Sequence, residues 1–249
     1  LKEANLKVVV DTGGGTASLV LPSLLGRLGI EVLTVNNGLD ELSPTETRDE
    51  RHSALERLGR LVSSSRADFG VHFDPVGERI SIVDERGTAI HDERALLVVL
   101  DLVAAELRGG RVALPVTTTR VAEQVASFHG VEVRRIPLSS SALTDAVLHD
   151  DVVFGGDGRG GFVVPEFSST FDGIAAFVQL LGLVARTHLR LSEIDARIPQ
   201  SHLARRTVST PWAAKGMVMR SVVEAAGGKV TGSVSKTTPA LSLRALFSR

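Results

Sequence analysis

A pattern of strand, loop, helix and strand occurs twice in this chain, and it restricts the fold more than any other feature. In the first copy, a valine strand at 8–10 precedes a glycine loop, an amphipathic helix and a strand at 31–35. In the second copy, a strand at 111–116 precedes a threonine loop, a helix and a strand that begins at Val131. A helix between two strands is the unit that builds parallel sheets, so the pattern predicts an α/β fold.

The two copies also share a short sequence at their second strand. Residues 29–32 read Gly-Ile-Glu-Val and residues 130–133 read Gly-Val-Glu-Val, an offset of 101 residues. We therefore predict two tandem α/β/α domains of similar topology with mixed, mostly parallel sheets. The expected domains are residues 1–100 and 101–205, and they meet near 93–108, where a helix is apolar on nearly every side.

Composition argues against several classes of function. The net charge is −1 and aromatic residues make up 4%, with no Tyr, so we expect no nucleic-acid partner. No apolar run reaches the roughly 20 residues that span a bilayer, so we expect no membrane partner. The chain has no Cys, which excludes disulfides and thiolate sites and favours a cytoplasmic location. The seven His are scattered without the spacing of a helical zinc site.

Two glycine-rich segments follow predicted strands. The segment 11–15 reads Asp-Thr-Gly-Gly-Gly and precedes a helix, where backbone N–H groups can face a phosphate. It lacks the Lys-Ser/Thr of a P-loop, so a tight turn is the favoured interpretation. Gly156, Gly158 and Gly161 match G-x-G-x-x-G, but a strand rather than a helix follows them. We therefore predict a substrate-facing loop there, not a dinucleotide site.

The segment 74–79 carries two carboxylates, Asp74 and Glu78, beside Arg79. Mg²⁺ prefers oxygen ligands in a near-octahedral arrangement, so these residues are the candidate metal ligands. Val76 lies between them and supplies no oxygen. A charged hairpin turn therefore competes with a weak magnesium site as the interpretation, and the turn is favoured.

The order of these segments resembles that of the phosphohexomutases, the phosphoglucomutase and phosphomannomutase family. The resemblance covers roughly residues 6–225. Its segments, in the order of the family, are 6–15, 67–74, 83–87, 115–120, 156–161, 171–174 and 211–220. Residues 74–79 stand at the place of the family's D-G-D-G-D-R metal loop, and 156–161 at the place of its sugar-binding G-E-x-S-G-H loop.

The resemblance implies a function in carbohydrate metabolism, the intramolecular transfer of phosphate on hexose phosphates with the help of Mg²⁺. It implies that Asp74 and Glu78 are remnants of the metal loop, so that magnesium is weakly bound or absent. Asp157 and Arg159 replace the Glu and Ser that contact sugar hydroxyls in the family, and Arg79 is kept. The three residues are therefore the candidate substrate-binding residues, and guanidinium groups pair well with phosphate.

Two parts of the family pattern have no counterpart here, namely the first domain with its phosphoserine and most of the fourth domain. Residues 206–249 are expected to be a truncated linker and remnant of that fourth domain, partly disordered. The resemblance implies a segment that is inactive alone and that has missing or fused neighbouring domains. Three alternatives stay open: an accessory sugar-phosphate-binding module fused to a mannose-1-phosphate guanylyltransferase-like enzyme, a fragment of an active mutase, and a non-carbohydrate α/β binding module.

Overall fold

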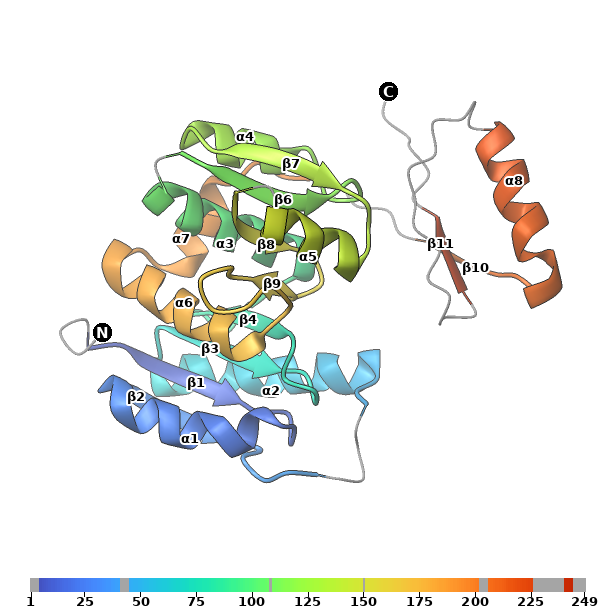
Figure 1. The fold of residues 1–249 in the computed structure, drawn as a ribbon. Coiled ribbons are helices and arrows are strands. Elements are labelled where there is room, and N and C mark those ends of the chain that lie inside the picture. Colours follow the sequence, from blue (N-terminus) through green and yellow to red (C-terminus); the bar gives the residue numbers. More distant parts are fainter. Residues whose placement is uncertain are drawn as a thin grey trace.

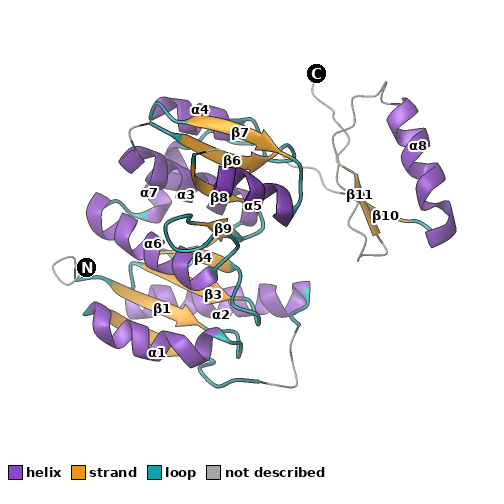
Figure 2. Cartoon of the chain, in the orientation of Figure 1, coloured by secondary structure: helices purple, strands orange, loops and turns teal. Residues whose placement is uncertain are grey.

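Two β-sheets with their helices form the main body of the protein (Figure 1). The computed structural model describes residues 5–40, 45–107, 109–149, 151–201, 206–225 and 240–243. Each sheet carries helices on its faces, as Figure 2 shows. Both sheets are mixed, which confirms the predicted α/β class.

The first sheet has the strand order β2-β1-β3-β4-β5. Strand β1 pairs in parallel with β2 and β3, while β4 and β5 add antiparallel pairs. The strands are β1 (Lys7–Asp11), β2 (Glu31–Val35), β3 (Phe69–Phe73), β4 (Ile80–Asp84) and β5 (Ala89–Ile90). Helix α1 (Ala17–Leu28) connects β1 to β2, and α2 (Arg48–Ser65) connects β2 to β3. Strands β1 and β2 are neighbours, whereas α2 carries the chain past β1 to β3, so β1 lies at the centre of the parallel part.

The second sheet repeats this topology with the order β7-β6-β8-β9. Strand β6 is parallel to β7 and β8, and β9 is antiparallel to β8. The elements are β6 (Arg111–Pro115), α4 (Val121–Phe128), β7 (Glu132–Ile136), α5 (Ser140–His149), β8 (Val152–Gly156) and β9 (Phe162–Val163). The tandem repeat predicted from the sequence is therefore confirmed, whereas the exact boundaries at 100 and 205 stay a prediction.

Helix α3 (Asp92–Leu107) joins the two sheets and is buried along most of its length. Every residue from Ala95 to Ala104 is buried, because α4, α6 (Gly173–Thr187), α7 (Leu191–Arg197) and β4 pack around it. A helix that is apolar on all sides requires this environment. One continuous apolar core contains side chains of both sheets and of α3, so the two domains share their interior.

Asp101 is the polar exception inside α3. Its side chain is 8% exposed, and His129 Nε2 lies 3.0 Å from its Oδ1. Arg197 in α7 donates to its other carboxylate oxygen. A buried carboxylate requires such partners to offset its desolvation. Asp101 therefore connects α3 to the end of α4 and to α7.

Some elements differ from the sequence-based prediction. The polar composition of residues 36–52, with Pro44 among them, predicts one exposed loop, but α2 begins at Arg48. A capping box starts the helix: Thr47 Oγ1 accepts from the Glu50 N–H at 3.3 Å, and Glu50 Oε2 accepts from the Thr47 N–H at 2.8 Å. Two backbone N–H groups that have no partner inside the helix are thereby satisfied. The polar residues that resemble a loop are the residues that begin the helix.

The C-terminal described residues form β10 (Arg206–Ser209), a 3₁₀ turn (Trp212–Ala214), α8 (Lys215–Ala225) and β11 (Ala240–Leu243). Strands β10 and β11 pair antiparallel. The partial disorder predicted for 206–249 falls in part on 226–239 and 244–249, which lie outside the described residues, whereas 206–225 and 240–243 form the elements named above. Among the described residues no single helix is long and apolar enough to cross a membrane; α6 and α7 meet that test only together, with a bend of 84°.

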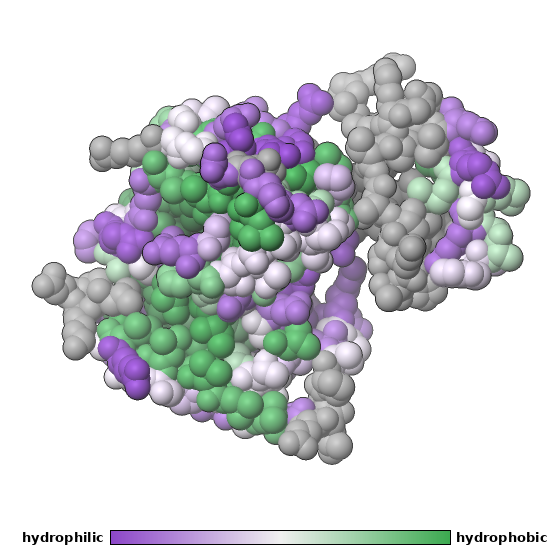
Figure 3. Space-filling model, viewed as in Figure 1, coloured by the Kyte–Doolittle hydropathy of each residue, from purple (hydrophilic) through white to green (hydrophobic). Residues whose placement is uncertain are grey.

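Apolar side chains also reach the surface at one edge of the first sheet. Leu19 and Val20 in α1 are 67% and 50% exposed, and Leu33 in the edge strand β2 is 40% exposed. Figure 3 shows apolar side chains gathered over this part of the molecule. Within the described ranges no segment covers these three residues, so α1 and β2 present an apolar face.

Candidate functional site

The two loops that the sequence analysis selected lie against each other. Loop 74–79 connects β3 to β4, and loop 156–161 leads from β8 into β9. The Ile80 N–H donates to the Gly160 carbonyl at 2.9 Å, and Arg79 forms an isolated antiparallel bridge with Gly161. The loops follow β3 and β8, which hold equivalent places in the two sheets. The repeated topology therefore brings both loops to the place where the two domains meet.

An ion pair fastens the two loops together. Arg79 Nη1 donates to Asp157 Oδ2 at 2.5 Å, with the side chains 32% and 11% exposed. The guanidinium carbon of Arg79 lies 4.8 Å from the centre of the Phe171 ring. Guanidinium groups favour both a carboxylate partner and an aromatic face, so Arg79 is fixed in place between the domains.

The carboxylate of Asp157 also shapes its own loop. Its Oδ1 accepts the N–H of Arg159 at 2.8 Å and the N–H of Gly161 at 3.1 Å. Both oxygens are therefore engaged, one by the loop and one by Arg79. The Arg159 side chain is exposed, and within the described residues its guanidinium has no hydrogen-bond partner. The structure thus brings Arg79, Asp157 and the Arg159 backbone together and leaves the Arg159 side chain open to solvent.

Glycines make this close approach of the loops feasible. Gly160 has φ +85°, and a Cβ there would lie 2.4 Å from the Ile80 carbonyl oxygen. A Cβ on Gly161 would lie 2.9 Å from the Phe171 ring. The G-x-G-x-x-G spacing that imitates a dinucleotide fingerprint therefore reflects contact between two loops.

The glycine loop at 11–15 is a tight turn, as the favoured interpretation held. Its N–H groups are already bonded within the protein: Gly13 donates to Asp11 Oδ1 at 2.9 Å, Gly14 to the carbonyl of Asn36 after β2 at 3.2 Å, and Gly15 to the Thr12 carbonyl at 3.0 Å. None of these three N–H groups is left for a phosphate. A helix N-terminus binds anions only when such donors are available.

A buried cluster of charged side chains, which was not predicted from the sequence, lies at the carboxyl ends of strands β1 and β3. His72 Nε2 lies 2.8 Å from Glu46 Oε1, and its Nδ1 lies 3.2 Å from Asp11 Oδ2, an ion-pair distance without hydrogen-bond geometry. Parallel pairing places Asp11 directly beside His72 in the register of β1 and β3. This pairing depends on the order of the strands in the sheet, and no local sequence pattern reveals that order.

The environment of His72 perturbs its titration strongly. Burial lowers the pKa of His72, but the carboxylates of Asp11 and Glu46 outweigh burial and raise the pKa to about 9. Burial raises the pKa of Asp11, yet the nearby imidazolium and the hydrogen bonds from Asn36 and Gly13 hold it below its usual value. His72 is therefore a buried imidazolium at neutral pH.

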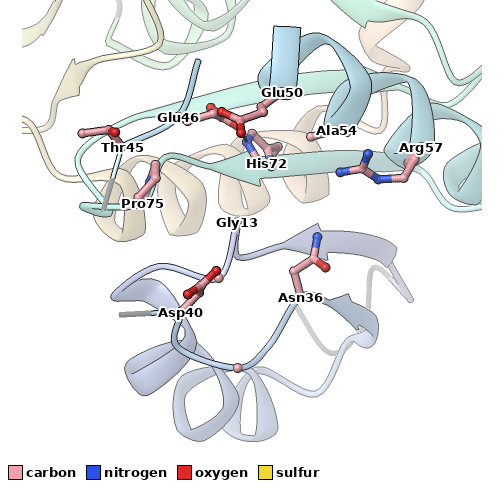
Figure 4. A pocket seen from close by; sticks show the side chains of 12 residues that line it. Gly13, Asn36, Asp40, Thr45, Glu46, Glu50, Ala54, Arg57, His72 and Pro75 are labelled. Carbon is pink, nitrogen blue, oxygen red and sulfur yellow. Dashed lines mark hydrogen bonds and ion pairs between the residues drawn. The ribbon is translucent and has the colours of Figure 1, made fainter. Parts of the chain in front are cut away.

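A cavity of about 290 Å³ lies above this cluster (Figure 4). It is bordered by the turn after β1, the segment after β2, the start of α2 and the end of β3. The lining residues with polar side chains are Asn36, Asp40, Thr45, Glu46, Glu50, Arg57 and His72. Pro75 is shared between this cavity and the loop 74–79, so the cavity borders the paired loops without containing their charged residues.

The fold and the paired loops define a protein of two tandem α/β/α domains that repeat one topology and join through their β-hairpin loops. The family model described as phosphoglucomutase/phosphomannomutase, alpha/beta/alpha domain II matches residues 1–87, and the model for alpha/beta/alpha domain III matches residues 91–202. The chain therefore belongs to the phosphoglucomutase/phosphomannomutase family.

Curated relatives of this chain are phosphosugar mutases. A phosphoglucomutase/phosphomannomutase of Thermococcus kodakarensis is 29% identical over 200 residues, which cover 80% of this chain and 44% of that protein. A probable phosphoglucosamine mutase of Methanopyrus kandleri is 30% identical over 217 residues, 87% of this chain and 48% of that protein. The chain thus spans about half the length of these relatives.

Solved structures share the fold. A phosphoglucomutase/phosphomannomutase family protein from Burkholderia thailandensis matches with a TM-score of 0.71 and 23% identity, covering 82% of this chain and 45% of that chain. An Aspergillus fumigatus N-acetylphosphoglucosamine mutase, solved in complex with GlcNAc-6P and magnesium, matches with a TM-score of 0.58 and 13% identity over 94% of this chain and 57% of that one. That neighbour thus binds magnesium together with its sugar phosphate.

The residues of loop 74–79 do not fit a magnesium ion. Asp74 Oδ1 accepts the Arg79 N–H at 2.9 Å, Glu78 is exposed, and Val76, 56% exposed, lies between them. Among the described residues no three His, Asp or Glu side chains are placed to hold a metal. A hard cation that prefers six oxygens would find two carboxylates here, one of them already bonded to the backbone.

We expect Mg²⁺ to bind this loop only weakly, because Val76 supplies no oxygen and the Asp74 carboxylate already accepts the Arg79 N–H. Isothermal titration calorimetry with MgCl₂ should show no saturable heat in the micromolar range. As a matched comparison, Val76→Asp restores a carboxylate between Asp74 and Glu78 and should strengthen any binding. Micromolar affinity in the parent chain that is lost in Asp74→Ala would contradict this expectation.

Proposed function

We propose that this chain is the central part of a phosphohexomutase, which presents two interlocked loops to a hexose phosphate and does not turn it over alone. The observation that carries the proposal is the Arg79–Asp157 ion pair, which joins the loops at the places of the family's metal and sugar loops. The absence of Cys fits our further proposal that the protein works in a reducing cytoplasm.

The two arginines supply the attraction for phosphate. Arg79 is 32% exposed and shares its charge with Asp157, while the Arg159 side chain faces solvent on the adjoining loop. Guanidinium groups bind phosphate through charge-assisted, often bidentate hydrogen bonds. Arg159 is therefore the main phosphate contact in this proposal, and Asp157 holds Arg79 and the loop in position.

Catalysis requires more than this attraction. Phosphoryl transfer depends on a positioned nucleophile and on dense charge stabilisation around the transferred group. The paired loops offer two guanidinium groups, one of them neutralised by Asp157. We assign no catalytic residue to the chain, and its role is to bind and position the sugar phosphate.

A second candidate function is that the chain is part of an active mutase. It is favoured by the lengths of the relatives, of which the chain covers 44% and 48%. In that case the neighbouring segments of the whole protein would supply the nucleophile, and the arginines would act within a larger site. The matched relatives are mutases, so we do not propose fusion to a guanylyltransferase.

We expect weak, millimolar binding of glucose 1-phosphate and glucose 6-phosphate, without interconversion. Arg159→Ala should weaken binding about 3- to 10-fold, as loss of one exposed charge-assisted contact implies. Asp157→Asn should tighten binding of the sugar phosphate, because the charge of the Arg79 guanidinium is then no longer neutralised by the Asp157 carboxylate. The measurements are NMR titration for affinity and a coupled assay for turnover.

Arg27→Ala provides a matched control, since Arg27 is an exposed arginine in the last turn of α1. Its affinity for both sugar phosphates should equal that of the parent chain. Turnover by the parent chain would overthrow the non-catalytic role. Equal affinities in the parent chain, Arg159→Ala and Arg79→Ala would remove the arginines from the site.

A further inference from the structure

Strand β2 is the outermost strand of the first sheet, and among the described residues it pairs with β1 alone. The Glu31 N–H donates to the Leu6 carbonyl at 2.9 Å, and the Val35 carbonyl accepts from the Thr12 N–H at 3.2 Å. The odd-numbered positions of β2 therefore turn their backbone groups toward β1. Because this direction alternates along a strand, positions 32 and 34 turn their N–H and C=O groups to the open edge.

Strand β7 holds the same place in the second sheet, and the two edges begin alike. Lys7 of β1 pairs with Glu31 of β2 at 2.7 Å, and Arg111 of β6 pairs with Glu132 of β7 at 3.2 Å. The repeated topology thus allows the two edge strands to be compared position by position.

The edges differ at their centres. Leu33 is in register with Val9 of β1, and Arg134 is in register with Ala113 of β6, so Leu33 and Arg134 hold equivalent positions. Natural edge strands often carry charged side chains that prevent pairing with a further strand. The edge of the second sheet has this protection, whereas the edge of the first sheet has Leu33, which is 40% exposed.

Leu33 lies at the margin of the face that α2 covers. Val9, its neighbour in β1, packs with Leu58 and Val62 of α2. Side chains in register on parallel strands point to the same face, so Leu33 points to the side of α2. Helix α2 packs over β1, β3 and β4 and leaves Leu33 partly open. The edge therefore combines open backbone groups with an exposed apolar side chain.

We propose that β2 is an interface between two copies of this chain, in which the two β2 strands pair antiparallel about a two-fold axis at Leu33. In this register Val32 lies opposite Thr34 of the partner subunit, so the open N–H and C=O groups of the two strands bond to each other. Leu33 packs against Leu33 of the partner subunit and leaves the solvent. The interface does not depend on the function proposed for the paired loops.

The charge pattern of β2 selects a second copy as the occupant. The strand has one charged residue, Glu31, at its start, and the antiparallel register places it opposite Val35 of the partner subunit. No like charges then face each other along the pair. The same operation on β7 would place two copies of Arg134 directly opposite, which is destabilising. The self-complementary edge is therefore that of the first sheet.

A single thiol tests the register, because the chain has no Cys. Opposed residues of a non-hydrogen-bonded antiparallel pair have Cα atoms about 4.5 Å apart, which suits a disulfide. Oxidation of Leu33→Cys should therefore give disulfide-linked dimers on a non-reducing gel. Val35→Cys is the matched control, since the axis separates its two copies by roughly 14 Å. Equal cross-linking of both variants, or none of Leu33→Cys, overturns the proposal.

Sedimentation equilibrium tests the dimer itself. The parent chain should dimerise reversibly at roughly 0.1–1 mM, as a small, transient interface implies. Leu33→Arg copies the charge of Arg134 and should weaken dimerisation at least about tenfold, because two guanidinium groups then oppose each other. Leu148→Arg, which replaces a 60% exposed leucine in α5, should keep the parent's dimerisation constant. A parent chain that stays monomeric over this range overturns the proposal.

Discussion

The protein is expected to lose ~3 kcal/mol of stability as the pH rises from 6.5 to 9, because His72 then loses its proton inside the fold. The pKa of His72 is about 9 in the folded chain, above the ordinary value of 6.5. A raised folded-state pKa means that the folded state binds the proton more tightly. The stabilisation is therefore complete below pH 6.5 and is lost as the pH passes through 9.

Urea unfolding at several pH values between 6 and 9.5 measures this loss. His72→Gln removes the titrating group while keeping a polar side chain of similar reach, so the difference in slope between parent and variant isolates His72. His52 is the matched control, since its side chain is 71% exposed and its ion-pair partner among the described residues is Glu56 in the same helix. His52→Gln should keep the parent slope, and a parent chain with constant stability over this range would contradict the buried imidazolium.

Most of the fold could be predicted because its strands and helices carry strong hydrophobic patterns. The run of valines in β1 indicates a buried strand, and the sixteen residues of α3 are enough to indicate a buried helix. Helix α7 was missed, because its seven residues, Leu191–Arg197, are too few for a periodic signal. Helix α5 was missed for a related reason: it buries only Leu143 and Ala146.

The candidate site was predictable in part. Loops 74–79 and 156–161 could be selected from their residues, but Arg79 and Asp157 are 78 positions apart. Their contact depends on how α3 and α6 orient the two sheets, which no local pattern contains. The cluster of Asp11, Glu46 and His72 was hidden for a similar reason, since it depends on the order and register of parallel strands.

Replacement of Gly160 by Ala is expected to destabilise the protein by ~3 kcal/mol or more. Gly160 has φ +85°, and an L residue in this region costs roughly 1–2 kcal/mol. Its Cβ would also lie 2.4 Å from the Ile80 carbonyl oxygen, which is backbone and cannot rotate away. Forcing such atoms apart costs about 1–3 kcal/mol more and breaks the hydrogen bond from Ile80 to Gly160.

Gly158 in the same loop separates these two costs. Its φ is +66°, but the nearest atoms to a Cβ there are 3.8 Å away, so Gly158→Ala should lose only the conformational part, roughly 1–2 kcal/mol. Urea unfolding of both variants gives the difference, which measures how tightly the two loops pack. Equal losses would mean that the loops do not touch in solution. A larger loss for Gly160→Ala, accompanied by weaker binding of glucose 6-phosphate, would show that the same contact that joins the domains also shapes the sugar-phosphate site.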